Sequence, residues 1–161
     1  MTAPASVIQI VIFKLGDDHF AADVFAVERV LRHVPPTAIP DVPLWIVGVI
    51  DYQQRVVPVI DLRQRFGLTA IEIKPETRLL VLNAGGEWVG AVVDAVVEVV
   101  SVDVAAITPP PPIFRGLAGE YLRGLVRRAD RLVIYLDVTR LLTTTDRLML
   151  DDARTEAATH G

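Results

Sequence analysis

The chain has 161 residues, carries a formal net charge of −4 and contains no cysteine, while 52% of its residues are hydrophobic. This length suits one domain or two small units that share a core, and the missing cysteines exclude disulfides, cysteine-built zinc sites and thiol nucleophiles. The acidic balance does not suit a nucleic-acid partner, and no apolar run reaches the ~18 residues of a membrane-spanning helix, so we expect neither nucleic-acid binding nor direct membrane insertion.

The chain opens with a predicted hairpin. Residues 1–6 are expected to form a flexible N-terminus, as chain ends often do. They lack the basic and apolar regions of a signal peptide, so we do not expect one. β-Branched residues make 7–15 a predicted strand, the Gly-Asp-Asp sequence at 16–18 is typical of a hairpin turn, and 19–22 continue as a second strand.

The next segment permits two local structures. Asp23 precedes apolar residues at helical spacing, namely Val24, Val27 and Leu31. One interpretation is therefore a short helical turn in which the Asp23 carboxylate caps the free backbone amides. The β-branched Val27 and Val30 suit a strand equally well, and the short apolar runs do not decide between the two.

A proline-rich loop leads to a second predicted hairpin. Proline removes ladder donors and disfavours helix in the residue before it, so 34–43 is expected to be extended. Two β-branched runs, 46–50 and 56–60, flank a polar connection and predict the hairpin. Asp61 follows, where its carboxylate is expected to cap a short helix by accepting from amides two or three residues on.

The second half contains the same kinds of elements. Residues 67–77 are expected to connect the halves. Strands are predicted in three further apolar runs, at 78–82, 88–93 and 96–102. A second proline-rich loop spans 108–113. It is followed at 122–142 by another predicted hairpin with a short helix after it. The tail at 143–161 is expected either to form an amphipathic helix capped by Asp146 or to fray.

The two halves resemble two divergent copies of one β-rich unit. The stretch at 46–66 aligns without gaps with the stretch at 122–142, so that Gly48, Arg55 and Asp61 fall on Gly124, Arg131 and Asp137. We therefore expect two related subdomains, at about 7–67 and 76–142, within one domain that spans 7–142. The sequence leaves open whether the subdomains divide at the midpoint of the chain or exchange a strand.

No set of residues for catalysis or cofactor binding emerges. Asp61 and Asp137 are the candidate carboxylates for acid–base chemistry, but their equivalence in the repeat and their position before helical turns favour capping. The histidines (His19, His33 and His160) lack ligand spacing, so we predict no metal site. No glycine-rich phosphate loop occurs, so we predict no cofactor. A β-rich chain of this kind is most simply a non-enzymatic binding module.

Four blocks of sequence, in order, are similar to those of the CheW family. They lie at Phe13–Val27, Pro40–Asp51, Val56–Phe66 and Val89–Val99. The third block, V-V-P-V-I-D-L-R-Q-R-F, together with the upstream G-V-I, is the specific part of the match. The resemblance covers about 8–142, which is nearly the whole chain.

The resemblance implies an all-β fold with short helices, in which two SH3-like five-stranded β-barrels pack together. It implies a non-enzymatic adaptor of bacterial chemotaxis that joins the cytoplasmic tips of chemoreceptors (methyl-accepting chemotaxis proteins) to the regulatory domain of the histidine kinase CheA. It also implies a cytoplasmic location at membrane-associated receptor arrays. By motif position, the receptor-binding groove between the barrels includes Val27, Val30 and Gly48. The alternative for the two valines is an ordinary place in the core.

The contact loop for the kinase falls on Asp51, Tyr52, Gln53 and Arg55, and here the chain departs from the family. The family turn usually has the sequence N-L-R-G, so Gln53 replaces the arginine implicated in partner contact and Gln54 replaces the turn glycine. An amide cannot reproduce the fork of donors that a guanidinium offers. The missing glycine also argues against a positive φ at position 54.

A second departure lies at 27–30, where the family usually has V-x-E-V and this chain has Val-Glu-Arg-Val. The acid lies one place earlier, and on a strand a shift of one place turns a side chain to the opposite face. Arg29 and Arg55 are therefore candidates for compensating polar contacts. An alternative function is a CheW-like scaffold of a pilus or other surface-behaviour pathway that binds receptor or kinase but not both.

Overall fold

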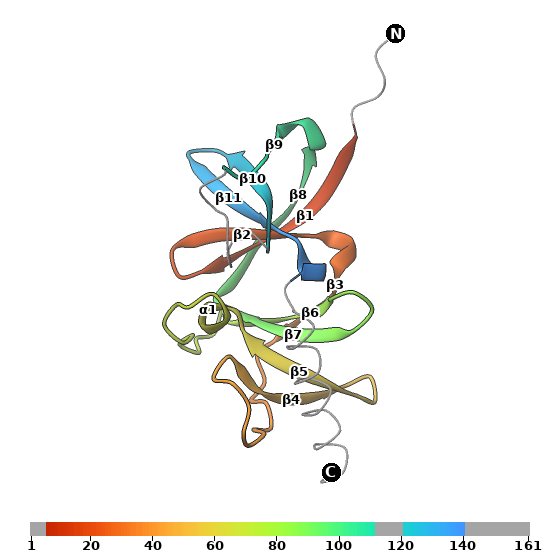
Figure 1. Ribbon diagram of the computed structural model, residues 1–161, viewed down its shortest axis with the longest axis vertical. Coiled ribbons are helices and arrows are strands. Elements are labelled where there is room, and N and C mark those ends of the chain that lie inside the picture. The colour runs from red at the N-terminus through yellow and green to blue at the C-terminus, as the bar shows by residue number, and fades with distance from the viewer. Residues whose placement is uncertain (1–5, 112–120, 141–161) are drawn as a thin grey trace.

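The computed structural model describes residues 6–111 and 121–140, and their strands form two β-sheets. Figure 1 shows the two sheets one above the other. The structure has a short α-helix of four residues, α1 (Leu62–Arg65). The helix predicted to follow Asp146 lies outside the described residues.

The upper sheet in Figure 1 has six strands in the order β8-β1-β2-β11-β10-β9. Their bounds are β1 (Val7–Leu15), β2 (Asp18–Asp23), β8 (Ala95–Asp103), β9 (Ile107–Thr108), β10 (Leu122–Arg128) and β11 (Arg131–Leu136). All neighbours are antiparallel except β2 and β11, which are parallel. The sixth strand is β9, which pairs with β10 through two residues at the edge of the sheet.

The lower sheet has five strands in the order β3-β6-β7-β5-β4. Their bounds are β3 (Val27–Arg32), β4 (Ile46–Tyr52), β5 (Arg55–Asp61), β6 (Arg78–Asn83) and β7 (Trp88–Val93). Here too one pair is parallel, β5 with β7, and the others are antiparallel. Thr37 of the first proline-rich loop adds a bridge to Val49 on the outer side of β4. The two sheets, each built around one parallel pair, are consistent with two SH3-like units.

Each sheet combines strands from both halves of the chain. The first hairpin, β1–β2, joins the last hairpin, β10–β11, in the six-stranded sheet. The hairpins β4–β5 and β6–β7, which flank the middle of the chain, form the core of the five-stranded sheet. The chain therefore exchanges strands between its two sheets instead of dividing at its midpoint.

The segment after Asp23 contains both of the predicted local structures in succession. The Asp23 carboxylate accepts a hydrogen bond of 2.8 Å from the Phe25 amide and caps a three-residue 3-10 helix, η1 (Val24–Ala26). The chain then continues directly into β3. Because the turn ends after three residues, the β-branched residues beyond it are free to join the sheet.

The buried apolar residues form three clusters. The largest lies between the sheets, since it takes buried residues from both, among them Phe13, Phe20, Leu80 and Leu136. The second cluster belongs to the six-stranded sheet and the third to the five-stranded sheet. A strand such as β1 contributes Ile12 to the second cluster and Phe13 to the first, as expected for side chains that alternate between faces.

Asp61 caps α1, as predicted, and also holds the connector that follows. Its carboxylate accepts hydrogen bonds from the amides of Arg63 at 2.9 Å and Gln64 at 3.3 Å, and from the amide of Ile71 at 2.9 Å. The side chain is buried. The carboxylate thus satisfies three backbone donors that burial would otherwise leave unpaired, which is a structural task.

Candidate functional site

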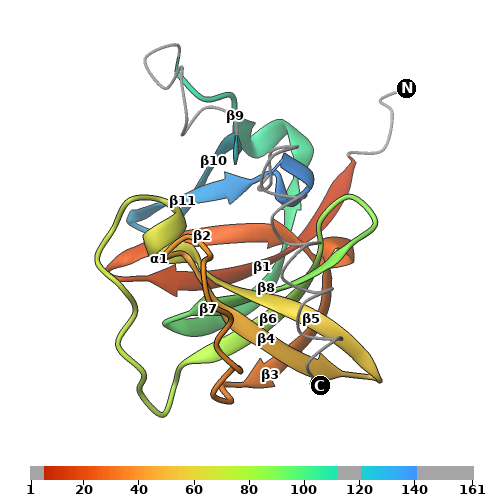
Figure 2. The same ribbon diagram turned by 60° about the horizontal axis from the view of Figure 1, so that its bottom comes forward.

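The β4–β5 hairpin, which lies at the front of the view in Figure 2, ends in a strained two-residue turn. Tyr52 pairs with Arg55, so Gln53 and Gln54 form the loop. Their φ angles are +49° and +64°, and positive φ at both central residues is the mark of a type I′ turn. The sequence-based argument against a positive φ at position 54 is therefore wrong. The loop length imposes the turn type, because I′ turns match the twist of the flanking strands.

An aromatic cluster stands beside this turn. The rings of Tyr52 and Trp88 have centroids 5.4 Å apart, and the guanidinium of Arg55 lies 4.3 Å from the Trp88 centroid. The Gln53 amide donates a hydrogen bond of 3.3 Å to the Tyr52 hydroxyl. Asp51 is exposed next to them. The structure therefore brings together the four residues of the predicted kinase loop and adds Trp88, which sequence reasoning missed because the pairing of β5 with β7 is not visible locally.

The β3 segment presents Val27, Arg29 and Val30 in different ways. Val27 is partly buried and packs against the cluster between the sheets, whereas Val30 is 40% exposed and Arg29 is exposed. The pairing with β6 shifts between Val27 and Arg29, so Glu28 sits in a β-bulge. The sequence argument that moving the acid by one place reverses its face assumes unbroken alternation, and this bulge interrupts that alternation.

Gly48 is buried against the first proline-rich loop. Its φ is +146°, and a Cβ at this position would lie 2.8 Å from the carbonyl carbon of Thr37 and would also collide with the carbonyl oxygen of that residue. The glycine thus permits the close approach that lets Thr37 bridge to Val49. Gly48 and Val30 lie on β4 and β3, the two opposite edges of the five-stranded sheet.

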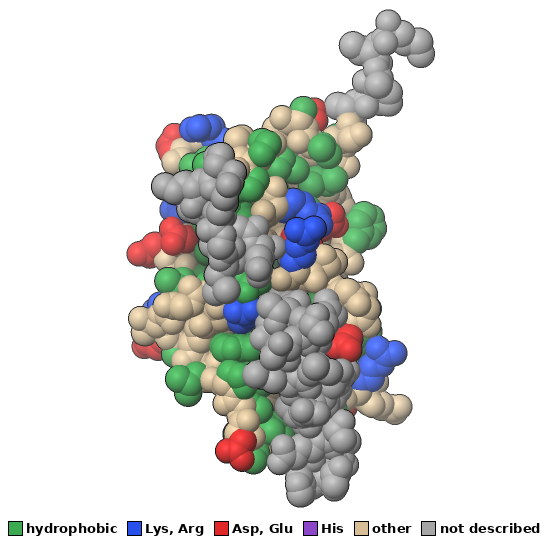
Figure 3. Space-filling model, in the orientation of Figure 1, with side chains coloured by type: hydrophobic (Ala, Val, Ile, Leu, Met, Phe, Trp, Pro, Cys, Tyr) green, Lys and Arg blue, Asp and Glu red, His purple; other side chains and the backbone are tan. Residues whose placement is uncertain are grey.

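Some exposed valines lie on strands that are each paired on one side only within the described residues. Val30 belongs to β3, and Val97 and Val99, which are 43% and 55% exposed, belong to β8. Sequence reasoning assigned no site to the β8 valines, although their repeated V-x-V spacing next to Glu98 was a visible signal. Figure 3 shows acidic and basic side chains dispersed over the viewed face instead of gathered in a patch of one sign.

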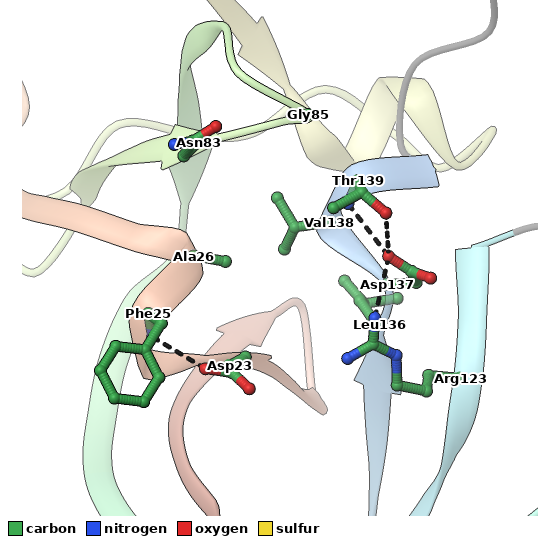
Figure 4. A pocket seen from close by; sticks show the side chains of 10 residues that line it. All are labelled: Asp23, Phe25, Ala26, Asn83, Gly85, Arg123, Leu136, Asp137, Val138 and Thr139. Carbon is green, nitrogen blue, oxygen red and sulfur yellow. Dashed lines mark hydrogen bonds and ion pairs between the residues drawn. The ribbon is translucent and has the colours of Figure 1, made fainter.

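A hollow of about 350 Å³ lies where η1, the β6–β7 turn and the end of β11 meet. Figure 4 shows Arg123 and Thr139 both directed at Asp137 on one side of it. The Asp137 carboxylate pairs with Arg123 at 3.2 Å and accepts from the Thr139 hydroxyl at 2.6 Å and the Thr139 amide at 3.1 Å. Asp137 therefore caps the 3-10 helix η4 (Val138–Arg140), which is the predicted capping role.

Asp137 is an ionised structural group. Burial by itself raises the pKa of a carboxyl, but the hydrogen bonds from Thr139 and the guanidinium of Arg123 outweigh burial and hold the pKa of Asp137 below its usual range. Among residues 6–111 and 121–140, no three His, Cys, Asp or Glu side chains are grouped so that they could hold a metal ion. No helix in the same residues is long and apolar enough to cross a membrane.

Comparison with known proteins identifies relatives along most of the chain. Residues 9–146 match the family model of the CheW-like domain. The chain is 33% identical to the Chemotaxis protein CheW of Klebsiella aerogenes over 144 residues, which cover 89% of this chain and 87% of that protein. It is also 33% identical to Protein FrzA of Myxococcus xanthus, with 82% of this chain and 83% of that protein covered.

A solved structure shares the fold. The crystal structure of the scaffolding protein TtCheW from Thermoanaerobacter tengcongensis superposes with a TM-score of 0.80 at 30% identity, covering 88% of this chain and 96% of that one. The likeness therefore extends over both sheets.

Proposed function

The chain belongs to the CheW-like domain family, and from this membership we propose that it is a non-enzymatic scaffold that couples the cytoplasmic tips of chemoreceptors to the regulatory domain of the histidine kinase CheA. The observation that carries the proposal is the match over 9–146, together with the fold shared with a scaffolding protein. The proposed place of action is the cytoplasm, at membrane-associated receptor arrays.

For the receptor, we propose a docking surface that includes Val27, Val30 and Gly48. Apolar side chains left in water favour burial by a partner, and Val30 is such a residue on an edge strand. In this arrangement Gly48 acts indirectly, because it keeps the loop around Thr37 close to β4.

Two valine variants test the receptor surface. Val30→Glu places a charge on an exposed position, so we expect receptor binding to fall by tenfold or more, about 1.4 kcal/mol, with little change in the urea midpoint. Val7→Glu, at a valine that is 59% exposed on β1, is the matched control and should leave binding unchanged. Equal binding by wild type and Val30→Glu would contradict the assignment.

Val27→Glu distinguishes a docking residue from a core residue. If Val27 faces the receptor, the variant folds and loses receptor binding. If Val27 is part of the packing between the sheets, where it contacts the large cluster, the unpaired charge unfolds the protein. Circular dichroism of the purified variant separates the two outcomes.

A pull-down with the cognate kinase and a receptor fragment tests the function itself. A scaffold of this kind binds both partners, separately and together. Binding to only one of them would favour the scaffold of a pilus or other surface-behaviour pathway, and binding to neither would refute the proposal.

A further inference from the structure

The tip of the β4–β5 hairpin carries one cation, Arg55, and that cation is held in place. Its guanidinium lies 4.3 Å from the centroid of the Trp88 ring, within the range of a cation–π contact. Trp88 in turn packs against the ring of Tyr52. A guanidinium that stacks on an aromatic face keeps the N–H groups at its edge available for hydrogen bonds. Arg55 is therefore oriented before any partner arrives.

Arg55 has no acidic partner in the part of the chain that the structure describes. Some arginines there do pair with an acid, as Arg123 does at 3.2 Å from Asp137 and Arg128 at 3.3 Å from Glu98; Arg55 is instead held on an aromatic ring. An ordered guanidinium with free N–H groups matches the geometry of a carboxylate, which accepts two parallel hydrogen bonds from it. The missing ligand of Arg55 is therefore expected to be an acidic side chain of another molecule.

The surroundings of Arg55 have the composition of a binding hot spot. Tyr, Trp and Arg are the side chains most enriched at such positions. Here Trp88 contacts both Tyr52 and Arg55. The adjacent type I′ turn, with Gln53 and Gln54 at positive φ, fixes where Arg55 leaves the tip of the hairpin. The platform is also firm, because Trp88 packs on the hydrophobic cluster inside the five-stranded sheet.

We propose that Arg55, held on Trp88, is the residue with which this chain selects its kinase, and that it binds a carboxylate on the regulatory domain of that kinase. This inference rests on the proposed function. The family arginine belongs to the turn, at the position of Gln53, whereas here the cation comes from β5 and its aromatic platform from β7. The partner must accordingly place its acid beside β5, which restricts the kinases that fit.

Calorimetric titration of the full chain with the regulatory domain of its cognate CheA tests the proposal. Arg55→Ala should weaken binding about 10- to 100-fold, the effect of removing a charged hydrogen bond from a hot spot. Arg55→Lys should lose most of that affinity, because a point charge cannot make the paired contact. Trp88→Val should also weaken kinase binding, because it removes the platform. Binding of the receptor fragment should stay within about twofold of wild type in the arginine variants. Val30, the exposed residue of the proposed receptor surface, lies on β3, three strands from β5 in the order of the sheet, and Gly48 on the neighbouring β4 is buried and unchanged in these variants.

Arg131 supplies a matched control. It occupies the same position in the second copy of the hairpin, but its guanidinium donates to the Asp17 carbonyl at 2.7 Å. Arg131→Ala changes the net charge by the same amount and should leave kinase affinity within about twofold. An equal loss in Arg131→Ala would show a general charge effect and overturn the proposal.

Two further results separate this inference from the function on which it rests. If wild type binds the kinase domain and Arg55→Ala binds equally well, the role of Arg55 is refuted and the scaffold function stands. If wild type does not bind the kinase domain at all, the kinase part of the function falls, and the role of Arg55 falls with it.

Discussion

Gln53 and Gln54 hold a backbone conformation that residues with side chains disfavour. Their φ angles of +49° and +64° lie in the left-handed region, which costs an L-residue roughly 1–2 kcal/mol. The hairpin tolerates this cost because β4 and β5 pair from Gly48 and Val59 up to Tyr52 and Arg55 and fix the loop at two residues. The strain is local, so it is open to a direct test.

Gln54→Gly should stabilise the protein. Glycine removes the strain but gives the unfolded chain more freedom, so we expect a net gain of about 0.5–1 kcal/mol in the free energy of unfolding, measured with urea. Gln64→Gly, within α1, serves as the control and should cost about 1 kcal/mol, because glycine is a poor helix former. A lower midpoint for Gln54→Gly would show that the turn is not strained.

Asp137 should make stability depend on pH in the acid range. Its pKa is lowered in the folded state, so its contribution is fully present above the unfolded carboxyl pKa of about 4 and is lost as pH falls through the folded value. Asp137→Asn should therefore cost on the order of 0.5–1 kcal/mol at pH 7, a modest amount because Arg123 is half exposed and solvent screens the pair.

The measurement is the free energy of unfolding in urea, determined for wild type and Asp137→Asn at several pH values from pH 7 to pH 3. The quantity of interest is the difference between the two proteins at each pH. That difference should shrink below about pH 4. A difference that is constant over this range would mean that the charge of Asp137 does not contribute.

At the scale of elements, two glycines allow the two proline-rich loops to reach the sheets. Gly48 faces Thr37, which bridges to Val49, and Gly124 faces Thr108, which pairs with Leu125. At Gly124 an added Cβ would lie 2.5 Å from the Ile107 Cγ2 atom and 2.8 Å from the Thr108 carbonyl oxygen. The same contact thus recurs in both copies, which explains why glycine stands at both positions of the repeat.

Gly124→Ala should destabilise the protein by about 2–3 kcal/mol, the range of an overpacked site, and Gly48→Ala by at least as much. Gly86→Ala is the control for Gly48, because both glycines have a positive φ but nothing lies within 4 Å of an added Cβ at Gly86. We expect it to cost about 1 kcal/mol from conformation alone. Equal losses in all three variants, measured by thermal or urea unfolding, would show that the contact with the loops is unimportant.

At the scale of the whole molecule, strand exchange ties the two halves of the chain into one folding unit. β6 and β7 from the second half are flanked by β3 and β5 from the first half, and β2 pairs with β11 across the length of the chain. Neither half carries a complete sheet, so neither can satisfy its backbone hydrogen bonds alone.

Cutting the chain in the connector tests this dependence. The fragments 1–74 and 75–161 should each lack cooperative unfolding when alone, and an equimolar mixture should regain the β-type circular dichroism of the full chain, because every sheet needs strands from both. The intact protein should unfold in a single urea transition. Cooperative folding of either fragment alone would contradict this account.

Local chemistry let the sequence predict most strands, the turn at Gly16, and the capping roles of Asp23, Asp61 and Asp137. Each of these features depends on residues a few positions apart, so a pattern of β-branched residues or a carboxylate before free amides is sufficient. The same locality explains the error at Gln54, where residue preference favoured one conformation and the pairing of the flanking strands imposed another.

The sequence by itself determined that the chain is a β-rich member of the CheW-like domain family, because periodicity and motif order are both written along the chain, and it predicted two related copies of one unit. Only the tertiary structure decided which strands share a sheet, that Gly48 lies beneath Thr37, and that Trp88 supports Arg55. These contacts join residues far apart in sequence, and they exist because burying the apolar faces of both sheets brings those residues together.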